Sequence, residues 1–385
     1  MIKKEISLYV HIPFCVSKCK YCDFLSAPAT ESEKEMYVTA LCRQVEREAF
    51  CYQDYEVKTI FFGGGTPTAL AALQLGKILK TIQKNFSVSG GNVEISIECN
   101  PGTAGYEAFR KMIQAGFNRL SIGLQSANNE ELKQLGRIHT WETFQKSYEE
   151  ARRAGFQNIN IDLMAALPGQ SISSYRDTLR KTLAIKPEHI SAYSLMIEEG
   201  TPFYNIYHDG NKTDGYQEYP PLPDEEEERG MYELTGWLLS EAGYDRYEIS
   251  NYAQKGKECL HNCVYWQRGN YLGLGLGSSS MIENKRWKNT DSMQEFLQMD
   301  FQKKELNILS TQEQMEEFMF LGLRLMQGIS SENFEDYFGC SFQKIYGNIV
   351  KKLIGQRFLE EGDSRIRLTK SGIDVSNRVL AEFLL

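Results

Sequence analysis

The feature that most limits the possible fold is a regular alternation of apolar strand segments with helical segments over the first half of the chain. Strands are expected at residues 6–10, 57–62, 93–99, 119–125, 158–163 and 189–195, with helices at 31–51, 69–86, 106–115, 141–154 and 173–185. Such alternation predicts a parallel sheet with right-handed crossovers. We therefore expect an α/β fold whose parallel strands are fewer than the eight of a closed barrel.

Polar side chains stand where several of these strands lose their apolar pattern. They are Glu98, Gln125, Asp162 and Tyr193, and Arg137 follows a little beyond Gln125. Ligands of parallel α/β folds bind at the carboxyl ends of the strands, so these side chains should converge on one face. Taken alone, each is more often a solvated loop residue or a helix cap. Their shared position is what indicates a ligand site.

Three consecutive glycines, Gly63, Gly64 and Gly65, end the second strand and are followed by Thr66. Glycine lets the backbone approach a ligand that any Cβ atom would exclude. A tight turn from strand to helix explains the same run equally well. The residues alone leave both interpretations open.

Three cysteines follow the first strand in a C-x3-C-x2-C pattern: Cys15, Cys19 and Cys22. Thiols this close in sequence do not disperse into a core, and Lys18 and Lys20 between them should favour the metal-binding thiolate form. Three thiolates can hold three irons of a [4Fe–4S] cluster and leave the fourth without a protein ligand. The alternatives are a zinc site completed by His11 or Asp23, or three unrelated thiols.

This cysteine spacing, with Tyr21 just before the last cysteine, resembles the radical S-adenosylmethionine (SAM) superfamily, in which SAM chelates the fourth iron. The longer string from Tyr9 to Cys15 resembles the branch that holds the oxygen-independent coproporphyrinogen III dehydrogenases and their HemW-type relatives. The resemblance implies an open (β/α)6 partial TIM barrel, and the Leu167–Gln170 turn belongs to the same family pattern. The SAM site that it implies contains Tyr9, Tyr21, Gly64, Gly65, Thr66, Glu98, Gln125, Arg137 and Asp162.

A second informative stretch contains His261, Asn262, Tyr265 and Trp266, flanked by Cys259 and Cys263. A histidine can ligate a heme iron and aromatic rings can pack against the porphyrin face. A hydrogen-bonded structural histidine and a core tryptophan explain these residues as well. The HNxxYW string is similar to a motif associated with HemW-type heme chaperones, which implies a heme site there. The Gly and Leu residues that alternate over 271–277 predict a strand pressed closely against a neighbour or a ligand.

The chain divides by pattern into a barrel at 1–205, a barrel extension at 206–306 and a C-terminal domain at 307–385. In the extension, the acidic run 224–228 predicts the first turn of a helix. The last unit is mostly helical with a hairpin around Gly362, which resembles the winged-helix-like domain of this family. Capping boxes are expected at Ser32 with Glu35 and at Thr311 with Gln314.

The composition of the chain bears on its binding partners and on its compartment. The net charge of −8 disfavours nucleic acid, so we expect the winged-helix-like domain to serve as a lid or docking domain. Nine cysteines, without a signal peptide or an apolar run near the ~20 residues that cross a bilayer, indicate reduced thiols in the cytoplasm.

One position separates the functions within this branch. The coproporphyrinogen III dehydrogenases carry a fourth cysteine two residues after the third, where this chain has Phe24. The resemblance therefore implies a heme chaperone that binds a [4Fe–4S] cluster, SAM and heme. It would pass heme to membrane-bound hemoproteins such as respiratory-chain components, at the membrane periphery. The alternatives are oxidative decarboxylation of coproporphyrinogen III and modification of heme, and no single residue is assigned a catalytic role.

Overall fold

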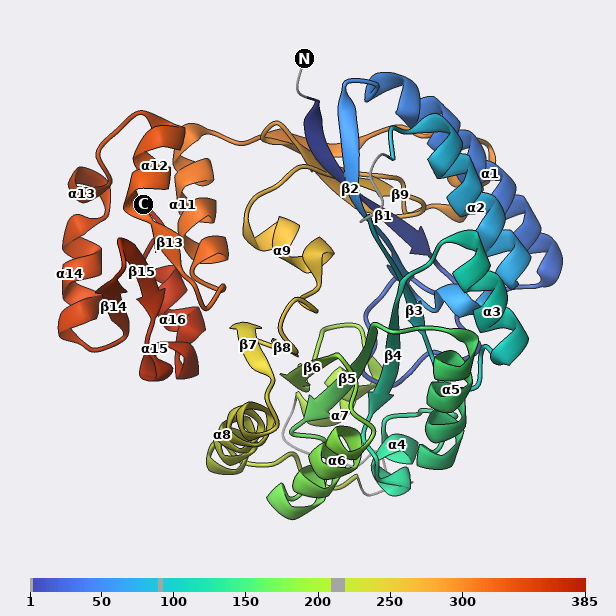
Figure 1. Cartoon of the computed structure of the whole chain (residues 1–385), viewed down its shortest axis with the longest axis horizontal. Helices are drawn as coiled ribbons and strands as arrows, with labels where there is room; N and C mark the ends of the chain where they lie inside the picture. The colour runs from blue at the N-terminus through green and yellow to red at the C-terminus, as the bar shows by residue number, and fades with distance from the viewer. Residues whose placement is uncertain (1–2, 89–92, 209–218) are drawn as a thin grey trace.

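A computed structural model describes residues 3–88, 93–208 and 219–385. Six parallel strands form the centre of a 12-stranded sheet, in the order of the chain (Figure 1). They are β1 (Lys4–Ile12), β2 (Tyr55–Gly64), β3 (Glu94–Cys99), β4 (Arg119–Gln125), β5 (Ile159–Ala165) and β6 (His189–Ser194). The predicted parallel (β/α)6 arrangement is confirmed, and the sheet curves into an open barrel.

Helices cover the outer face of this barrel (Figure 1). They are α1 (Glu31–Cys51), α2 (Ala72–Asn85), α3 (Tyr106–Ala115), α4 (Asn129–Gln134), α5 (Trp141–Ala154) and α6 (Ile172–Ala184). The prediction missed α4, and it started α2 too early because residues 67–69 form a separate 3₁₀ turn. Pro67 at the start of that turn fixes its backbone and has no N–H to donate.

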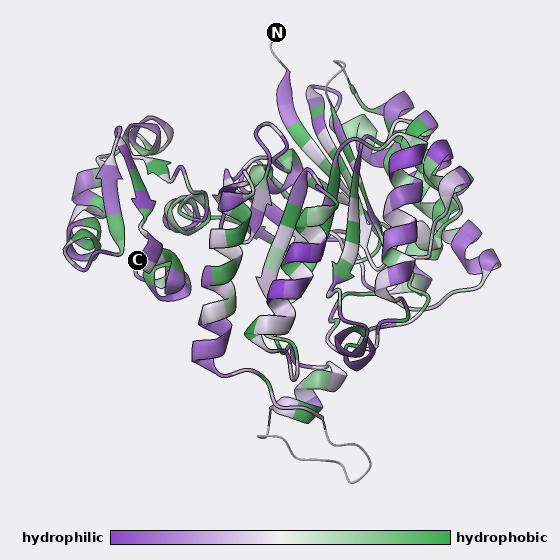
Figure 2. Cartoon of the chain, turned by 60° about the horizontal axis from the view of Figure 1, so that its bottom comes forward, coloured by the Kyte–Doolittle hydropathy of each residue, from purple (hydrophilic) through white to green (hydrophobic). Residues whose placement is uncertain are grey.

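The two faces of the strands differ in chemistry, although both are buried. Outward residues such as Leu8, Ile60 and Ile122 are aliphatic and pack under the helices. Inward residues are largely polar; they include Ser7, Thr59, Ser96, Arg119, Asn160 and His189, all nearly inaccessible to solvent. Figure 2 shows hydrophilic and hydrophobic residues mixed along these strands. The core of the protein therefore lies between sheet and helices, whereas the barrel lumen is polar.

Further strands are added at both edges of the six-stranded central sheet. Strand β9 (Tyr271–Leu274) adds in parallel beside β1, followed by β10 (Ser279–Ile282), β11 (Lys285–Lys288) and β12 (Lys304–Ile308). Strands β8 (Asn251–Ala253) and β7 (Asp245–Glu248) add antiparallel beyond β6. The close approach predicted for the 271–277 strand is confirmed, because a Cβ at Gly275 would lie 2.5 Å from the Tyr37 hydroxyl.

Among the described residues, four further helices lie in the segments between these strands. They are α7 (Pro202–Tyr207), α8 (Glu225–Glu241), α9 (Leu260–Trp266) and α10 (Met293–Leu297). The acidic run does begin α8, which Asp224 caps. Helix α9 carries the HNxxYW residues and lies on the open side of the barrel, toward the C-terminal unit (Figure 1).

The C-terminal unit has its own hydrophobic core, which includes Met319, Phe334, Tyr346 and Phe383. It contains α11 (Thr311–Gly322), α12 (Ser331–Phe338), α13 (Phe342–Ile345), α14 (Gly347–Gly355), α15 (Lys370–Asp374) and α16 (Ser376–Ala381). Its small sheet joins β13 (Ile329–Ser330), β14 (Leu359–Gly362) and β15 (Arg365–Leu368). Helices followed by this hairpin match the expected mostly helical, winged-helix-like domain.

Both predicted capping boxes were placed too late in the sequence. Helix α1 is capped by Thr30 with Glu33, and α11 by Ser310 with Glu313. Ser32 already lies inside the first turn of α1. The physical reason is that a capping residue must be extended and precede the first helical residue.

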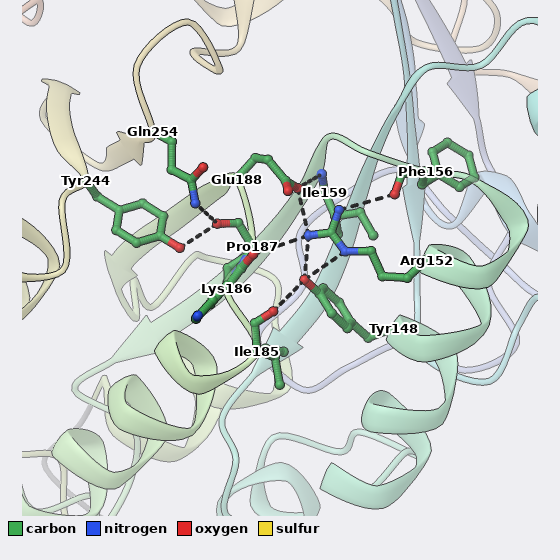
Figure 3. Close-up of polar contacts among 10 residues, drawn as sticks. All are labelled: Tyr148, Arg152, Phe156, Ile159, Ile185, Lys186, Pro187, Glu188, Tyr244 and Gln254. Atoms are coloured by element: carbon green, nitrogen blue, oxygen red, sulfur yellow. Dashed lines mark hydrogen bonds and ion pairs between the residues drawn. The ribbon is translucent and has the colours of Figure 1, made fainter.

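The amino ends of β5 and β6 are closed by a paired polar network (Figure 3). The Glu188 carboxylate lies 2.8 Å from a guanidinium nitrogen of Arg152 and accepts the Ile159 N–H at 2.9 Å. The Tyr148 hydroxyl donates to the Ile185 carbonyl and accepts from Arg152. The donors and acceptors of Tyr148, Arg152 and Glu188 therefore find partners within the fold, so the role of this network is structural.

Candidate functional site

The cysteine loop begins at the carboxyl end of β1, and its end pairs with its own start through backbone hydrogen bonds. The Cys15 N–H donates to the Ala27 carbonyl, and the Ala27 N–H donates to the Pro13 carbonyl. Cys15, Cys19 and Cys22 are free thiols and are all partly exposed. Three accessible thiols on one ordered loop, at the end of the barrel where ligands bind, fit the corners of an iron–sulfur cluster.

The zinc alternative fits less well. In the described part of the chain, no three side chains of His, Cys, Asp or Glu gather closely enough for a single metal ion. Both ring nitrogens of His11, the proposed fourth ligand, are engaged, at 3.1 Å from the Tyr9 hydroxyl and 3.0 Å from the Leu25 carbonyl oxygen. A single zinc ion needs its ligands within ~2.3 Å of one point.

A polar chain connects the first two cysteines. The Cys15 sulfur lies 3.2 Å from the Thr66 hydroxyl, which accepts the Asn100 amide at 2.7 Å. The Asn100 oxygen accepts from Arg137 at 2.8 Å, and another guanidinium nitrogen of Arg137 lies 3.6 Å from the Cys19 sulfur. Thr66, Asn100 and Arg137 also line a small cavity of about 20 Å³ beside Cys19. Neutral donors and one cation thus face the space next to the thiols.

The predicted effect of the lysines is wrong for Cys22. Burial raises the pKa of this thiol, and Lys18 opposes the rise only weakly. The Lys20 ammonium donates to the Tyr219 hydroxyl at 3.1 Å, away from the thiols. The cation that contacts a cysteine sulfur is Arg137, which comes from the segment after β4.

The glycine run packs against the cysteine loop. A Cβ on Gly65 would lie 2.7 Å from the Phe14 carbonyl oxygen, and one on Gly64 would lie 2.5 Å from the His11 ring. Gly64 also has a φ of +113°, which other residues rarely adopt. Both glycines are therefore required to seat the loop, and their contact with SAM stays a prediction.

Two carboxyl groups face the lumen, and their environment disfavours the charged form. Burial, with the nearby Asp162 as the second cause, raises the pKa of Glu98 to about 8. Burial also raises the pKa of Asp162, although this carboxylate accepts hydrogen bonds from Asn160 at 2.7 Å and from Ser121 at 3.0 Å. With Tyr9, these groups line a cavity of about 180 Å³. Shifted pKa values and a cavity together are typical of ligand sites.

The remaining predicted SAM residues, Gln125 and Tyr21, lie close to this site. Gln125 has a φ of +70° and accepts a hydrogen bond from Tyr193 at 3.3 Å. A non-glycine residue held in this region is strained, and such strain clusters at functional sites. Tyr21 packs against a small apolar cluster that contains Leu135 and Phe203, and its ring lies near Arg137.

The HNxxYW residues do not all face the same space. His261, Asn262 and Tyr265 line the 180 Å³ cavity, whereas Trp266 points to the C-terminal unit, where the Arg324 guanidinium lies 4.4 Å from its ring centre. The His261 Nδ1 lies 2.7 Å from the Thr59 hydroxyl and its Nε2 lies 2.9 Å from the Tyr265 hydroxyl. Burial lowers the pKa of His261 to about 3. The neutral ring is thus held at both nitrogens.

The two cysteines near this motif are poor metal ligands as they stand. Burial raises the pKa of Cys259 and that of Cys263 to about 12, so both stay protonated thiols at neutral pH. Cys259 directly precedes α9, and its sulfur lies 3.7 Å from a Glu94 carboxylate oxygen.

Asn100 and Arg119 are among the residues of the site that sequence reasoning missed. Asn100 directly follows the β3 residues and completes the chain between Thr66 and Arg137. Arg119 opens β4 in phase with Ser121 and therefore points into the lumen. The signal was available, because a strand buried on both faces with polar residues at alternate positions, here Arg119, Ser121 and Gln125, indicates a polar interior.

Comparisons with known proteins agree with this geometry. The family model described as "Radical SAM superfamily" matches residues 9–182, and that described as "HemN C-terminal domain" matches 309–375. The heme chaperone HemW of Lactococcus lactis subsp. lactis (strain IL1403) is 37% identical over 390 residues, covering 100% of this chain and 99% of that protein. The heme chaperone HemW of Escherichia coli (strain K12) is 34% identical, covering 98% of each.

A solved structure shows the same fold. The coproporphyrinogen III oxidase HemN from Escherichia coli, described as a radical SAM enzyme, superposes with a TM-score of 0.84 at 23% identity, covering 100% of this chain and 91% of that one. Helices long and apolar enough to cross a bilayer are absent from the described ranges.

Proposed function

Because the chain belongs to the HemW family of the radical SAM superfamily, we propose that it is a heme chaperone that delivers heme to membrane hemoproteins. The observation that carries this proposal is end-to-end similarity to several proteins named heme chaperone HemW. Phe24 supports it, since this exposed side chain stands where the related dehydrogenases carry a fourth cysteine. Delivery would take place in the cytoplasm at the membrane surface.

The family implies a [4Fe–4S] cluster and SAM, and the residues present fit both. We assign Cys15, Cys19 and Cys22 to three irons and SAM to the fourth. Around SAM, the polar groups of Thr66, Glu98, Gln125, Arg137 and Asp162 supply donors and acceptors, and Tyr9, Tyr21, Gly64 and Gly65 shape the walls. When bound and reduced, such a cluster supplies one electron to SAM.

Heme is the cargo in this proposal. Asn262 and Tyr265 line the cavity and are available to it, whereas His261 would ligate iron only after releasing the Thr59 or the Tyr265 hydroxyl. Trp266 is covered by Arg324 and would contact heme only if the C-terminal unit moved. A heme-induced change at these two residues is therefore part of the proposal.

The second candidate is oxidative decarboxylation of coproporphyrinogen III. It is favoured by the whole-chain likeness of fold to coproporphyrinogen III oxidase and by the buried carboxyl groups in the lumen. In that case SAM would supply the means to remove a hydrogen atom from a propionate side chain, and the side chain would lose carbon dioxide and one electron, which passes to an external one-electron acceptor, to leave a vinyl group.

One experiment separates the two. Anaerobically reconstituted protein is given either heme, followed by membranes that contain an apo-hemoprotein, or coproporphyrinogen III with SAM and reductant. We expect stoichiometric heme binding and transfer, with an unchanged tetrapyrrole mass in the second arm. Decarboxylated product without heme transfer would contradict the chaperone proposal. His261→Ala should slow transfer, and His208→Ala, at the exposed end of α7, is the matched control.

A further inference from the structure

The 180 Å³ cavity extends into the barrel below the predicted SAM residues. We call it the lumen chamber, and its walls include Tyr9, Glu98, Arg119, Asp162, His261 and Tyr265. The upper wall is shared with the predicted SAM site through Glu98 and Asp162. The lower wall is made by Arg119 and α9, and Arg119 has no role in the chemistry described so far.

Arg119 is the unusual group in this chamber. Its side chain is 2% exposed, yet its guanidinium makes no hydrogen bond or ion pair with any residue in the described ranges, and its Nε is fully buried without a partner. A guanidinium is a planar fork of five N–H donors that stays charged. Burying it without acceptors costs several kcal/mol. The donors of such a group in a cavity are available to an acceptor from outside the chain.

The carboxylates near Arg119 are committed elsewhere. Glu94 accepts the backbone N–H groups of Leu260 and His261 at 3.1 and 3.0 Å and thereby holds the start of α9. Asp162 accepts from Asn160 and Ser121. Burial lowers the pKa of Arg119, but the effects of Cys259, Glu94 and Asp162 through space outweigh burial and raise it. They keep the guanidinium charged without filling its donor sites.

Hydrogen bonds connect the residues of the far wall of the chamber. The Thr59 hydroxyl lies 2.8 Å from the Ser7 hydroxyl and 2.7 Å from the His261 ring, which in turn holds the Tyr265 hydroxyl. This chain of contacts joins β1, β2 and α9 across the barrel. These hydrogen bonds therefore place His261 and Tyr265 in the wall of the same chamber as the guanidinium.

We propose that the lumen chamber is a carboxylate-binding subsite in which Arg119 pairs with a carboxylate side chain of the tetrapyrrole, an inference that rests on the function proposed above. A carboxylate matches the guanidinium fork with two parallel hydrogen bonds. It carries a single negative charge, which suits a chamber that already holds Glu98 and Asp162 better than a phosphate would. The volume is below the ~300 Å³ of whole-ligand pockets, so it accommodates one arm of a larger molecule.

The test compares heme with heme dimethyl ester, which has the same macrocycle but no free carboxylate. Binding of each is measured by absorbance titration to anaerobically reconstituted full-length protein. The variants are Arg119→Met, which keeps the volume and removes the charge, and Arg119→Lys, which keeps the charge and loses the fork. Arg152→Met, in the polar network at the amino ends of β5 and β6, is the control.

We expect wild-type protein and the Arg152→Met variant to bind heme about tenfold or more tightly than the ester. Arg119→Met should abolish this preference, and Arg119→Lys should restore part of it. Equal binding of heme and ester by wild-type protein would overturn the carboxylate subsite and leave the chaperone proposal intact. A full preference in a folded Arg119→Met variant would overturn the role of Arg119. Binding of neither compound would instead contradict the proposed function itself. Should Arg119→Met fail to fold, the wild-type comparison still decides whether a carboxylate is recognised.

Discussion

Two regions of the barrel, the amino ends of β5 and β6 and the lumen, handle buried charge in opposite ways. At the amino end, Arg152 and Glu188 pair with each other and with backbone groups at the starts of β5 and β6 (Figure 3). In the lumen, Arg119 has no partner in the described part of the chain, and the charged forms of Glu98 and Asp162 are disfavoured. The first arrangement stabilises the fold. The second lowers stability and keeps donors and acceptors free for a ligand.

The largest effect on stability should come from disrupting the polar network at the amino ends of β5 and β6. Glu188→Ala removes the partner of Arg152 and leaves the Ile159 N–H without an acceptor, so we expect it to lower the free energy of unfolding by about 3 kcal/mol. Urea denaturation measures this. Glu107→Ala breaks an exposed ion pair with Arg110 and should cost less than about 1 kcal/mol. Equal losses of unfolding free energy in the two variants would contradict the expected difference between this buried network and an exposed ion pair.

Next in size is a pH dependence from Glu98. Its pKa is raised from the ordinary 4.5 to about 8, so between these values the folded protein binds a proton that the unfolded chain releases. Stability from this group is complete below pH 4.5 and is lost as pH rises toward 8. The side chain keeps some exposure to the cavity, so we expect a loss of about 2 kcal/mol. Glu98→Gln should flatten this part of the profile, and an unchanged slope would contradict a protonated Glu98.

A smaller effect is expected just after the cysteine loop. Thr30→Ala removes the cap of α1 and should cost about 1 kcal/mol of unfolding free energy. Ser32→Ala, inside the first turn, should cost less than half of that. Denaturation midpoints of the two variants, compared with wild type, are sufficient to measure the difference, and the reverse order would move the cap to Ser32.

The smallest loss of stability should follow removal of the most buried arginine. Because the Arg119 guanidinium makes no hydrogen bond within the described ranges, Arg119→Met removes a buried charge without an acceptor, so it should not lower the free energy of unfolding and should raise it by about 1 kcal/mol or more. Arg152 is more exposed, yet Arg152→Met should cost more. A severe loss of stability in Arg119→Met would mean that Arg119 holds the fold together.

The sequence was sufficient to predict the order and type of the barrel elements. Helices α1, α3 and α5 and strand β4 have the predicted bounds, because their periodicity and their breaks are local properties of the chain. The small helix α4 was missed because it is only six residues long and has no clear period. The caps of α1 and α11 were misplaced because two candidate residues stand close together and only the backbone decides between them.

The site was predictable where its residues fall at strand ends, and unpredictable where contacts cross the fold. The meeting of Arg137 with Cys19 joins residues 118 positions apart, and neither the lysine spacing nor the periodicity predicts it. The hydrogen bonds that hold His261 depend on Thr59, which is 202 residues away. A motif shows which residue types are present, whereas the three-dimensional structure decides whether their polar atoms are free.

The most direct test of the account is the iron content of cysteine variants. Anaerobically reconstituted Cys15→Ser, Cys19→Ser and Cys22→Ser proteins are compared with Cys51→Ser, which changes an exposed thiol outside the loop. Iron, sulfide and visible absorption are measured with and without SAM. The account predicts that each loop variant loses the cluster, whereas Cys51→Ser keeps four irons per chain, a cluster of the [4Fe–4S] type, and a spectrum that responds to SAM. A full cluster in any loop variant, or zinc in place of iron in wild-type protein, would contradict it.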